Sequence, residues 1–449
     1  MTKIAFIGAG SVIFARNLLG DILSYPELQG CTVSLMDINQ NRLDRTVTAA
    51  NAVVEHNDVE AVIESTTERE EALEDADYVL NMIHVGGREP FENEIQIPAK
   101  YGVGQAVGDT LGPGGIFRLL RTAPVMLDLA HDMEELCPNA LLLNYTNPMA
   151  MVCWAVDEAT EIDIVGLCHS VQHTAEAIAN YVEVPKEELE YKVAGINHMA
   201  WFLEAEHNGK SVYPTLRAAI NERDIYNRDN VRFEILRHFD AFVTESSHHM
   251  SEYIPYFRTD EATLEQFIVE ENYEEYFVDW MPTGQYFEHW CEYQQEAAEM
   301  DTSEIEPEIE RSEEYGSRII HSIETGEPRR MNINVRNDEG AIANLASDAC
   351  VEVPCLVDDR GINPCTVGKL PPQLAALNRS NIDVQRLAVR AALEHDEDAL
   401  RQAVKLDPLT AATCSLEEID DMVDDLLAAN ADYLPDQLVE ESAQSIATN

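Results

Sequence analysis

The sequence predicts an α/β protein that begins with a Rossmann-like, doubly wound parallel sheet. Short apolar runs alternate with amphipathic helical segments through the first third of the chain. The first of these runs ends in a Gly-x-Gly turn at residues 8–10. Strands that alternate with helices favour a parallel sheet, and such sheets bind ligands beyond the carboxyl ends of their strands.

The predicted strands are four apolar runs, and a helical segment starting at Val12 follows the first of them. The runs cover residues 3–7, 32–37, 78–83 and 140–145. The second half differs, because residues 258–314 are rich in acids and aromatics, and the chain closes with acid-faced helical segments such as residues 416–429. A chain of 449 residues is too long for one simple core. We therefore expect a domain at residues 1–195 and a mixed α+β, largely helical domain at residues 196–449.

Charge is the outlying feature of the composition. The chain has 83 acidic and 30 basic residues, a formal net charge of −53, and only seven of the basic residues are lysines. Such a surface repels nucleic acids and anionic membranes, which excludes both as partners. Because salt screens self-repulsion, the acidic shell suits a halophilic protein that works in a high-salt cytoplasm.

The cysteines and the N-terminal segment indicate a reducing compartment. There are nine cysteines and no CxxC pair, so most, including Cys31, Cys153, Cys350 and Cys355, are predicted to be reduced and buried. The chain runs directly into its first strand, with no leader-like segment and no apolar run of about 18 residues. These features predict a soluble cytoplasmic protein.

The first turn carries a candidate dinucleotide site. Gly8 and Gly10 allow the backbone to approach a pyrophosphate at a helix N-terminus, and the Ser11 hydroxyl adds a donor. Ile13 occupies the place of the third glycine of the usual fingerprint. Asp37 ends the second strand, where a carboxylate accepts bonds from the ribose diol and repels a 2′-phosphate, which favours NAD over NADP.

Cys168 and His198 are candidate metal ligands. Each follows a short apolar run, and thiolate and imidazole are common ligands of divalent transition metals. From residue type alone, Cys168 is also consistent with a core filler and His198 with a hydrogen-bonded interior histidine.

Six short motifs occur in order along the chain. They are residues 8–11 (GAGS), 109–115 (DTLGPGG), 144–149 (NYTNPM), 166–170 (GLCHS), 195–198 (GINH) and 244–247 (TESS). Together these motifs resemble those of glycoside hydrolase family 4, and most closely those of its α-galactosidase members. The resemblance runs from residue 3 to about residue 435.

The resemblance implies a hydrolase that works by transient oxidation, an exception to the two-carboxylate scheme of most glycosidases. In this family NAD⁺ takes hydride from C3 of the sugar, a base removes the C2 proton, the aglycone leaves C1 by elimination, and water and hydride then add back. A metal ion, usually Mn²⁺, stabilises the enediolate as a Lewis acid. The implied cofactors are thus NAD and Mn²⁺.

The resemblance also assigns roles to individual residues. Cys168 and His198 correspond to the metal ligands, and Asn147 to a substrate-binding asparagine. Asp109 opens the glycine-rich loop that lies near cofactor and metal in the family, although a loop-structuring role is nearly as well supported. Asn147 alone reads as a turn-forming Asn-Pro.

The base and the leaving-group acid are assigned with alternatives. Tyr253 aligns with the family's C2 base, but Tyr256 lies three residues on, and an aromatic packing role is also open. His169 stands where phospho-glycosidase members carry an acid, which makes it the candidate proton donor. His248 and His249 are further candidates for binding sugar hydroxyls.

The predicted function is an α-glycosidase acting on α-galactosides. Alternatives within the family are an α-galacturonidase, an α-glucosidase and a glucuronidase, although the Cys-His-Ser motif and the few lysines argue against 6-phospho-glycosides. Outside the family, a plain NAD-dependent hydroxyacid dehydrogenase and a non-catalytic NAD sensor are the competing readings. The expected partner is a small glycoside, and relatives suggest a homodimer or homotetramer.

Overall fold

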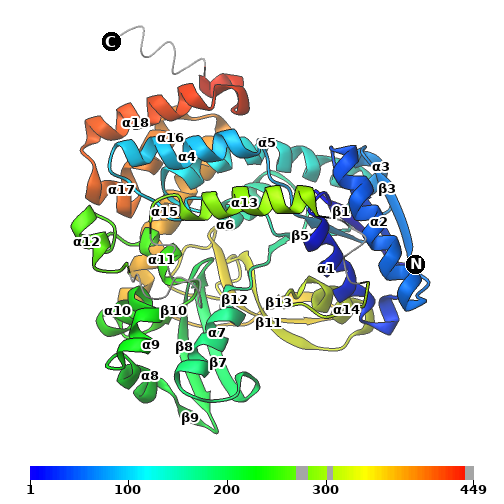
Figure 1. Ribbon diagram of the computed structural model, residues 1–449, viewed down its shortest axis with the longest axis horizontal. Coiled ribbons are helices and arrows are strands. Elements are labelled where there is room, and N and C mark those ends of the chain that lie inside the picture. Colours follow the sequence, from blue (N-terminus) through cyan, green and yellow to red (C-terminus); the bar gives the residue numbers. More distant parts are fainter. Residues whose placement is uncertain (269–281, 301–306, 440–449) are drawn as a thin grey trace.

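A computed structural model describes residues 1–268, 282–300 and 307–439. Within these residues thirteen strands form one continuous sheet, in the order β10-β8-β7-β12-β11-β6-β5-β4-β1-β2-β3, with β13 paired to β12 and β9 to β8 (Figure 1). Two halves of different character therefore share one sheet.

The first half is parallel. Its strands are β1 (Lys3–Ile7), β2 (Thr32–Met36), β3 (Val62–Thr66), β4 (Tyr78–Asn81), β5 (Leu141–Asn144) and β6 (Ile164–Gly166). The spatial order β3-β2-β1-β4-β5-β6 is that of a doubly wound dinucleotide-binding sheet. The Rossmann-like fold class is thus confirmed, and each of the four predicted strands lies within a residue or two of its expected bounds.

Helices connect these parallel strands. They are α1 (Val12–Leu23), α2 (Gln40–Asn57), α3 (Arg69–Leu73), α4 (Arg88–Lys100), α5 (Gly112–Leu136), α6 (Met149–Ala159) and α7 (Ser170–Tyr181). In α1 the predicted apolar face is buried: Val12, Leu18, Leu19, Ile22 and Leu23 all lack solvent contact or nearly so. A helix with one apolar stripe must cover a sheet face, and α1 does so.

The second half extends the sheet with antiparallel strands. These are β7 (Leu189–Ile196), β8 (Met199–His207), β9 (Lys210–Ser211), β10 (Phe242–Val243), β11 (Arg329–Arg336), β12 (Cys350–Asp358) and β13 (Gly361–Pro364). Strand β11 joins the two halves, since Asn334 pairs with Gly166 of β6. The sheet crosses the expected boundary at residue 195, and the division into two domains stays a prediction.

Helices dominate the rest of the second half. They are α8 (Tyr213–Ala219), α9 (Arg223–Arg228), α10 (Asn230–Phe239), α11 (Ser247–Tyr253), α12 (Glu261–Glu265), α13 (Gln285–Glu299), α14 (Gly316–Thr325), α15 (Pro372–Glu394), α16 (Glu397–Leu406), α17 (Pro408–Thr413) and α18 (Leu416–Ala429). Figure 1 shows β7, β8, α8 and α9 at one end of the molecule and α1, α2 and β3 at the other. The two halves of the chain therefore form the two ends of the sheet.

Helix α18 illustrates how the acidic sequence still folds. A capping box of Ser415 and Glu418 starts it, and its buried side chains are Ile419, Met422, Val423, Leu426 and Leu427. The acids occupy the remaining face.

The cysteines Cys31, Cys153, Cys350 and Cys355 are buried and free, as predicted. No helix in the described ranges combines the length and apolarity needed to cross a membrane.

The charge of the chain leads to a stability prediction. With a net charge of −53, the folded protein concentrates more like charge than the expanded unfolded chain. Salt screens this repulsion, so the melting temperature should be clearly higher in about 2 M KCl than in about 0.1 M KCl. Differential scanning calorimetry at both salt concentrations checks this, and equal melting temperatures would rule out the high-salt interpretation.

Candidate active site

A deep cavity opens at the carboxyl ends of β1, β2 and β4. Its volume is about 1280 Å³, and its lining includes Gly8, Gly10, Ser11, Asp37 and Met82. Gly8 has φ +87°, a backbone conformation that glycine adopts readily and other residues rarely do. A Cβ at this position would lie 3.0 Å from the backbone of Ile83. The predicted cofactor residues thus line a single cavity large enough for a dinucleotide.

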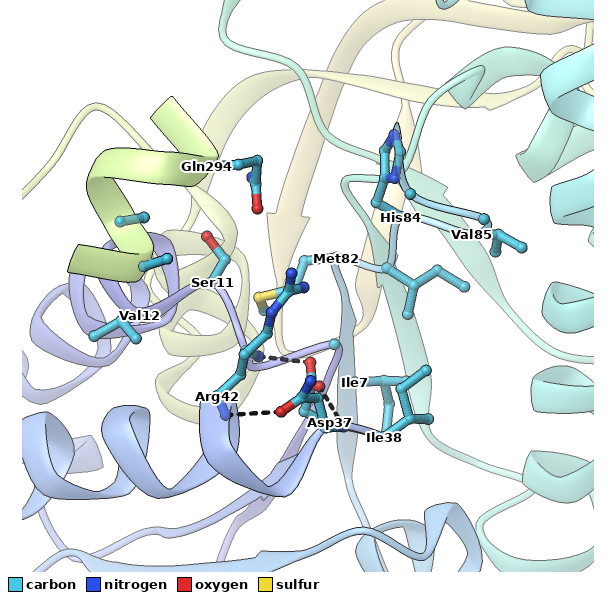
Figure 2. Close-up of a pocket in the computed structure, with 18 of the residues that line it drawn as sticks. Ile7, Ser11, Val12, Asp37, Ile38, Arg42, Met82, His84, Val85 and Gln294 are labelled. Atoms are coloured by element: carbon cyan, nitrogen blue, oxygen red, sulfur yellow. Dashed lines mark hydrogen bonds between the residues drawn. The ribbon is translucent and has the colours of Figure 1, made fainter. Parts of the chain in front are cut away.

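Asp37 is fixed by the backbone of this cavity. Its carboxylate accepts bonds from the N–H groups of Gly10 (2.8 Å) and Asn39 (2.8 Å). A Cβ on Gly10 would lie 2.4 Å from Asp37 Oδ2, so only glycine allows this approach. Figure 2 shows Asp37 on the cavity wall, below Ser11 and Arg42. Because each carboxylate oxygen has two lone pairs, both oxygens can still accept ribose hydroxyls.

Helix α13 covers this cavity from the second half of the chain. Gln294 faces Ser11 across the cavity in Figure 2, and Trp290 of the same helix stacks on His84 at 4.9 Å. Arg45 of α2 donates bonds to the carbonyls of Ala297 (2.5 Å) and Met300 (2.9 Å) and so ties the helix end down. Sequence reasoning did not find His84, since a lone histidine after a strand carries no pattern.

The buried Asp109 and the half-buried Asn147 form a polar pair. The Asn147 amide donates to Asp109 Oδ2 at 3.0 Å, and Arg118 lies 3.8 Å from the same oxygen. Burial acts to raise the pKa of Asp109, but the charges of Arg118 and His249 outweigh burial and bring this pKa below its usual value. Asp109 therefore presents a carboxylate beside Asn147.

Cys168 and His198 come together although thirty residues separate them. Cys168 follows β6, and its peptide is held by the Tyr315 hydroxyl, which accepts from the Cys168 N–H (3.1 Å) and donates to its carbonyl (3.2 Å). His198 occupies the turn between β7 and β8 with φ +61°. Burial, with the nearby Glu245 and Glu352, raises the pKa of the Cys168 thiol to about 12, so the thiolate needs a cation beside it.

Tyr253 and Tyr256 have different environments. Tyr253 is 1% exposed and its hydroxyl lies 3.2 Å from His198 Nδ1, whereas Tyr256 is 53% exposed and its ring lies against Phe239 at 6.1 Å. Burial raises the pKa of Tyr253 well above its ordinary value, and the carboxylates of Asp109 and Glu245 act in the same direction. Of these two tyrosines, Tyr253 is therefore the one whose hydroxyl lies beside His198.

His169 follows Cys168 in the chain, and its side chain is 47% exposed to solvent. Its Nδ1 is 3.2 Å from Glu314 Oε1, and this hydrogen bond raises the pKa of the imidazole to about 9. His169 thus has a carboxylate partner on one side and solvent on the other.

Two carboxyl groups, those of Glu245 and Glu352, lie beside Cys168 and His198 and were not predicted as site residues from the sequence. Glu245 follows β10 and lies 3.5 Å from His198 Nε2 and 3.8 Å from His249 Nδ1. Glu352 of β12 is 0% exposed, and neither of its oxygens has a hydrogen-bond partner among the described residues. His248 bonds to Ser246 at 3.1 Å. The Thr-Glu-Ser-Ser motif marked residue 245, but it does not set that glutamate apart from the many other acids.

Glu352 gives a testable pH dependence of stability. Burial raises its pKa to about 8; His198 opposes the shift and Glu245 adds to it. Between pH 4.5 and 8 the unfolded chain loses this proton while the folded protein keeps it, so each pH unit of rise costs about 1.4 kcal/mol of stability. Glu352→Gln should therefore gain stability relative to the unmodified protein as pH rises from about 5 to about 8.

Urea unfolding of the metal-free proteins in concentrated KCl measures this difference. The exposed Glu60 supplies a matched control, Glu60→Gln, whose stability difference should not change over the same range. A constant difference between Glu352→Gln and the unmodified protein would contradict the account of this carboxyl.

The fold and this site define a dinucleotide-binding protein with a partly buried thiol–imidazole–carboxylate cluster. Sequence models described as "Family 4 glycosyl hydrolase" and "Family 4 glycosyl hydrolase C-terminal domain" match residues 3–184 and 193–410. The chain belongs to glycosyl hydrolase family 4 and is therefore a glycoside hydrolase, which confirms the predicted family and enzyme class.

Two curated relatives extend over nearly the whole chain. An α-galactosidase of Bacillus subtilis (strain 168) is 42% identical over 97% of this chain and 100% of its own length. An α-galactosidase of Rhizobium meliloti (strain 1021) is 39% identical over 96% of this chain and 89% of its own length. Among solved structures, a 6-phospho-β-glucosidase of Thermotoga maritima with manganese, NAD⁺ and glucose-6-phosphate has a TM-score of 0.78 at 22% identity, over 96% of this chain and 99% of that one.

Proposed function

We propose that the protein is an α-galactosidase that hydrolyses α-galactosides through transient NAD-dependent oxidation at C3 of the sugar. The observation that supports the proposal most strongly is that Cys168, His198 and Tyr253 lie together in one partly buried cluster, within a family 4 chain that also has a dinucleotide cavity. The two relatives at about 40% identity, both α-galactosidases, support this substrate class.

The cavity fits NAD. The backbone approach at Gly8 and Gly10 suits a pyrophosphate, and the Asp37 carboxylate suits a ribose diol while repelling a 2′-phosphate. Bound NAD⁺ supplies a hydride acceptor. The chain's own part is to hold the dinucleotide under α13 and to exclude water from it, with Trp290 and His84 forming one wall.

The cluster fits a divalent metal ion such as Mn²⁺. Cys168 and His198 would hold the ion, and Tyr253 occupies His198 Nδ1, which leaves Nε2 for it. A bound dication would supply Lewis-acid stabilisation of the negative charge that develops on the oxidised sugar when its C2 proton is removed.

The remaining steps belong to side chains. Tyr253 takes the C2 proton and returns one, and His169 gives a proton to the leaving oxygen. Asn147 binds sugar hydroxyls, and the carboxylate of Asp109 beside it is the third catalytic group. Glu314 orients the His169 imidazole through their 3.2 Å contact, and the exposed side of the ring exchanges protons with solvent.

A screen of nitrophenyl glycosides tests this function. The protein is assayed with NAD⁺, Mn²⁺, a thiol reductant and high salt together, on α-galactosides, α-galacturonides, α-glucosides and α-glucuronides. Nitrophenol release from the α-galactoside without net NADH accumulation is expected. Accumulating NADH would instead support a dehydrogenase. A preference for a galacturonide or glucuronide would show that the substrates are uronides rather than α-galactosides.

We further propose a halophilic setting in the cytoplasm and a homodimeric or homotetrameric assembly. The charge of −53 supports the first of these. Size-exclusion chromatography with light scattering in concentrated KCl measures the assembly.

A further inference from the structure

The donor atoms of three side chains surround one point in the cluster. A ligand atom of Cys168, one of His198 and one of Glu245 all lie within 4.8 Å of one another. Donors bonded to one ion at about 2.0 to 2.4 Å lie up to about twice that distance apart. One ion can therefore touch all three side chains with little movement of the protein.

The orientation of His198 points its free nitrogen at Glu245. Nδ1 faces the Tyr253 hydroxyl at 3.2 Å, and Nε2 lies 3.5 Å from Glu245 Oε2. A metal-bound histidine commonly engages its second nitrogen in such a bond, which fixes the ring. The carboxylate thus sits beside the nitrogen that is available to a metal.

The backbone holds His198 and Glu245 in place at the ends of two paired strands, since His198 directly precedes β8 and Glu245 follows β10. Strand β10, which ends just before Glu245, pairs with β8; Thr244 N–H donates to Ala200 O (2.8 Å), and Ala200 N–H donates to Thr244 Oγ1 (3.0 Å). His198 (φ +61°) and Glu245 (φ +72°) both adopt the left-handed region, which non-glycine residues rarely do. Such conformations concentrate at functional sites.

Charge gives a second, independent indication. Among the described residues the salt-bridge partners of Glu245 are the histidines His198 and His249, with no lysine or arginine. Nearby, Glu352 is fully buried and has no hydrogen-bond partner in the described chain. Glu245 accepts local bonds from the Ser246 N–H (3.2 Å) and hydroxyl (3.4 Å), and a dication held beside it would balance the negative charge that these neutral donors leave.

We propose that Glu245 is the third protein ligand of the metal ion that Cys168 and His198 hold. The inference rests on the metal site of the proposed function and adds a hard oxygen donor to it. Carboxylate oxygen suits Mn²⁺, whereas a thiolate alone favours softer ions. The thiolate and the carboxylate together neutralise the dication, which leaves a site for the uncharged hydroxyl oxygens of a sugar.

The test measures Mn²⁺ affinity in the full-length, metal-free protein without sugar, from the electron paramagnetic resonance signal of free Mn²⁺. Glu245→Gln should raise the Kd by more than about a hundredfold, beyond the tenfold to hundredfold effect of losing an outer-shell partner of a ligand. Glu245→Asp, which keeps the carboxylate, should bind Mn²⁺ more tightly than Glu245→Gln. Glu397→Gln is the matched control, because Glu397 is a largely buried carboxylate of α16 that pairs with Arg401 outside the cluster, and the Kd of this variant should not change.

Cobalt substitution and folding controls separate the possible failures. The thiolate-to-cobalt absorption band should persist in Glu245→Gln and vanish in Cys168→Ser, and NAD⁺ binding by Glu245→Gln should match the unmodified protein. If Glu245→Gln binds Mn²⁺ normally while Cys168→Ser and His198→Ala do not, the inference about Glu245 is wrong and the proposed metal site stands. If none of the three changes the Kd, the metal site itself is wrong.

Discussion

Cys168→Ser and His198→Ala are each expected to lower kcat/KM by about a thousandfold or more, because Lewis-acid stabilisation by a metal contributes several kcal/mol. Neither residue lines the dinucleotide cavity, which is built from the ends of β1, β2 and β4 and from α13. Affinity for NAD⁺ should therefore stay close to that of the unmodified protein. Steady-state kinetics, metal analysis and calorimetric titration with NAD⁺ measure the three quantities.

Cys365→Ser serves as the matched control for the thiol. Cys365 is a partly exposed free cysteine just after β13, outside the cluster, so its replacement should leave metal content and activity unchanged. Normal Mn²⁺ content in both Cys168→Ser and His198→Ala would refute the ligand assignment.

Tyr253→Phe is expected to lower kcat by about a hundredfold to ten-thousandfold, the usual contribution of a general base. Phenylalanine keeps the buried ring but loses the hydroxyl that lies 3.2 Å from His198 Nδ1. Because burial and the Asp109 and Glu245 carboxylates raise the pKa of Tyr253, its phenolate depends on a nearby cation. Activity should therefore fall for the loss of either the hydroxyl or the metal.

Tyr256→Phe is the control for this assignment. Tyr256 is half exposed and packs on Phe239, so its hydroxyl should contribute little to turnover. Full activity of Tyr253→Phe together with loss of activity in Tyr256→Phe would identify Tyr256, and not Tyr253, as the base.

Local patterns were sufficient to predict four of the six parallel strands, β1, β2, β4 and β5, which are short apolar runs. The largely exposed β3 and the three-residue β6 were not predicted as strands. The 3.6-residue spacing of α1 and α18 matches their buried faces. The antiparallel extension could not be predicted, since the pairing of Asn334 with Gly166 joins residues far apart in the chain. Periodicity within a segment carries no information about such partners.

The candidate site was predicted where a residue type is rare and missed where it is common. Cys168 and His198 belong to sparse residue types in recognisable motifs, and the structure brings their side chains together. Glu245 and Glu352 are two among 83 acids, so neither stands out before the fold places them beside the cluster. His84 lines the cofactor cavity beside Trp290 of α13, but no local pattern in the sequence marks it.

Hydrolysis in D₂O tests the central claim most directly. In the proposed reaction Tyr253 removes the proton at C2 of the sugar and later returns one, and the phenol proton exchanges with solvent between these steps. The galactose released from an α-galactoside by the protein with NAD⁺ and Mn²⁺ should therefore carry deuterium at C2, as seen by mass spectrometry and proton NMR. A direct displacement at C1 never breaks the C2–H bond, so galactose with unlabelled C2 would contradict the mechanism.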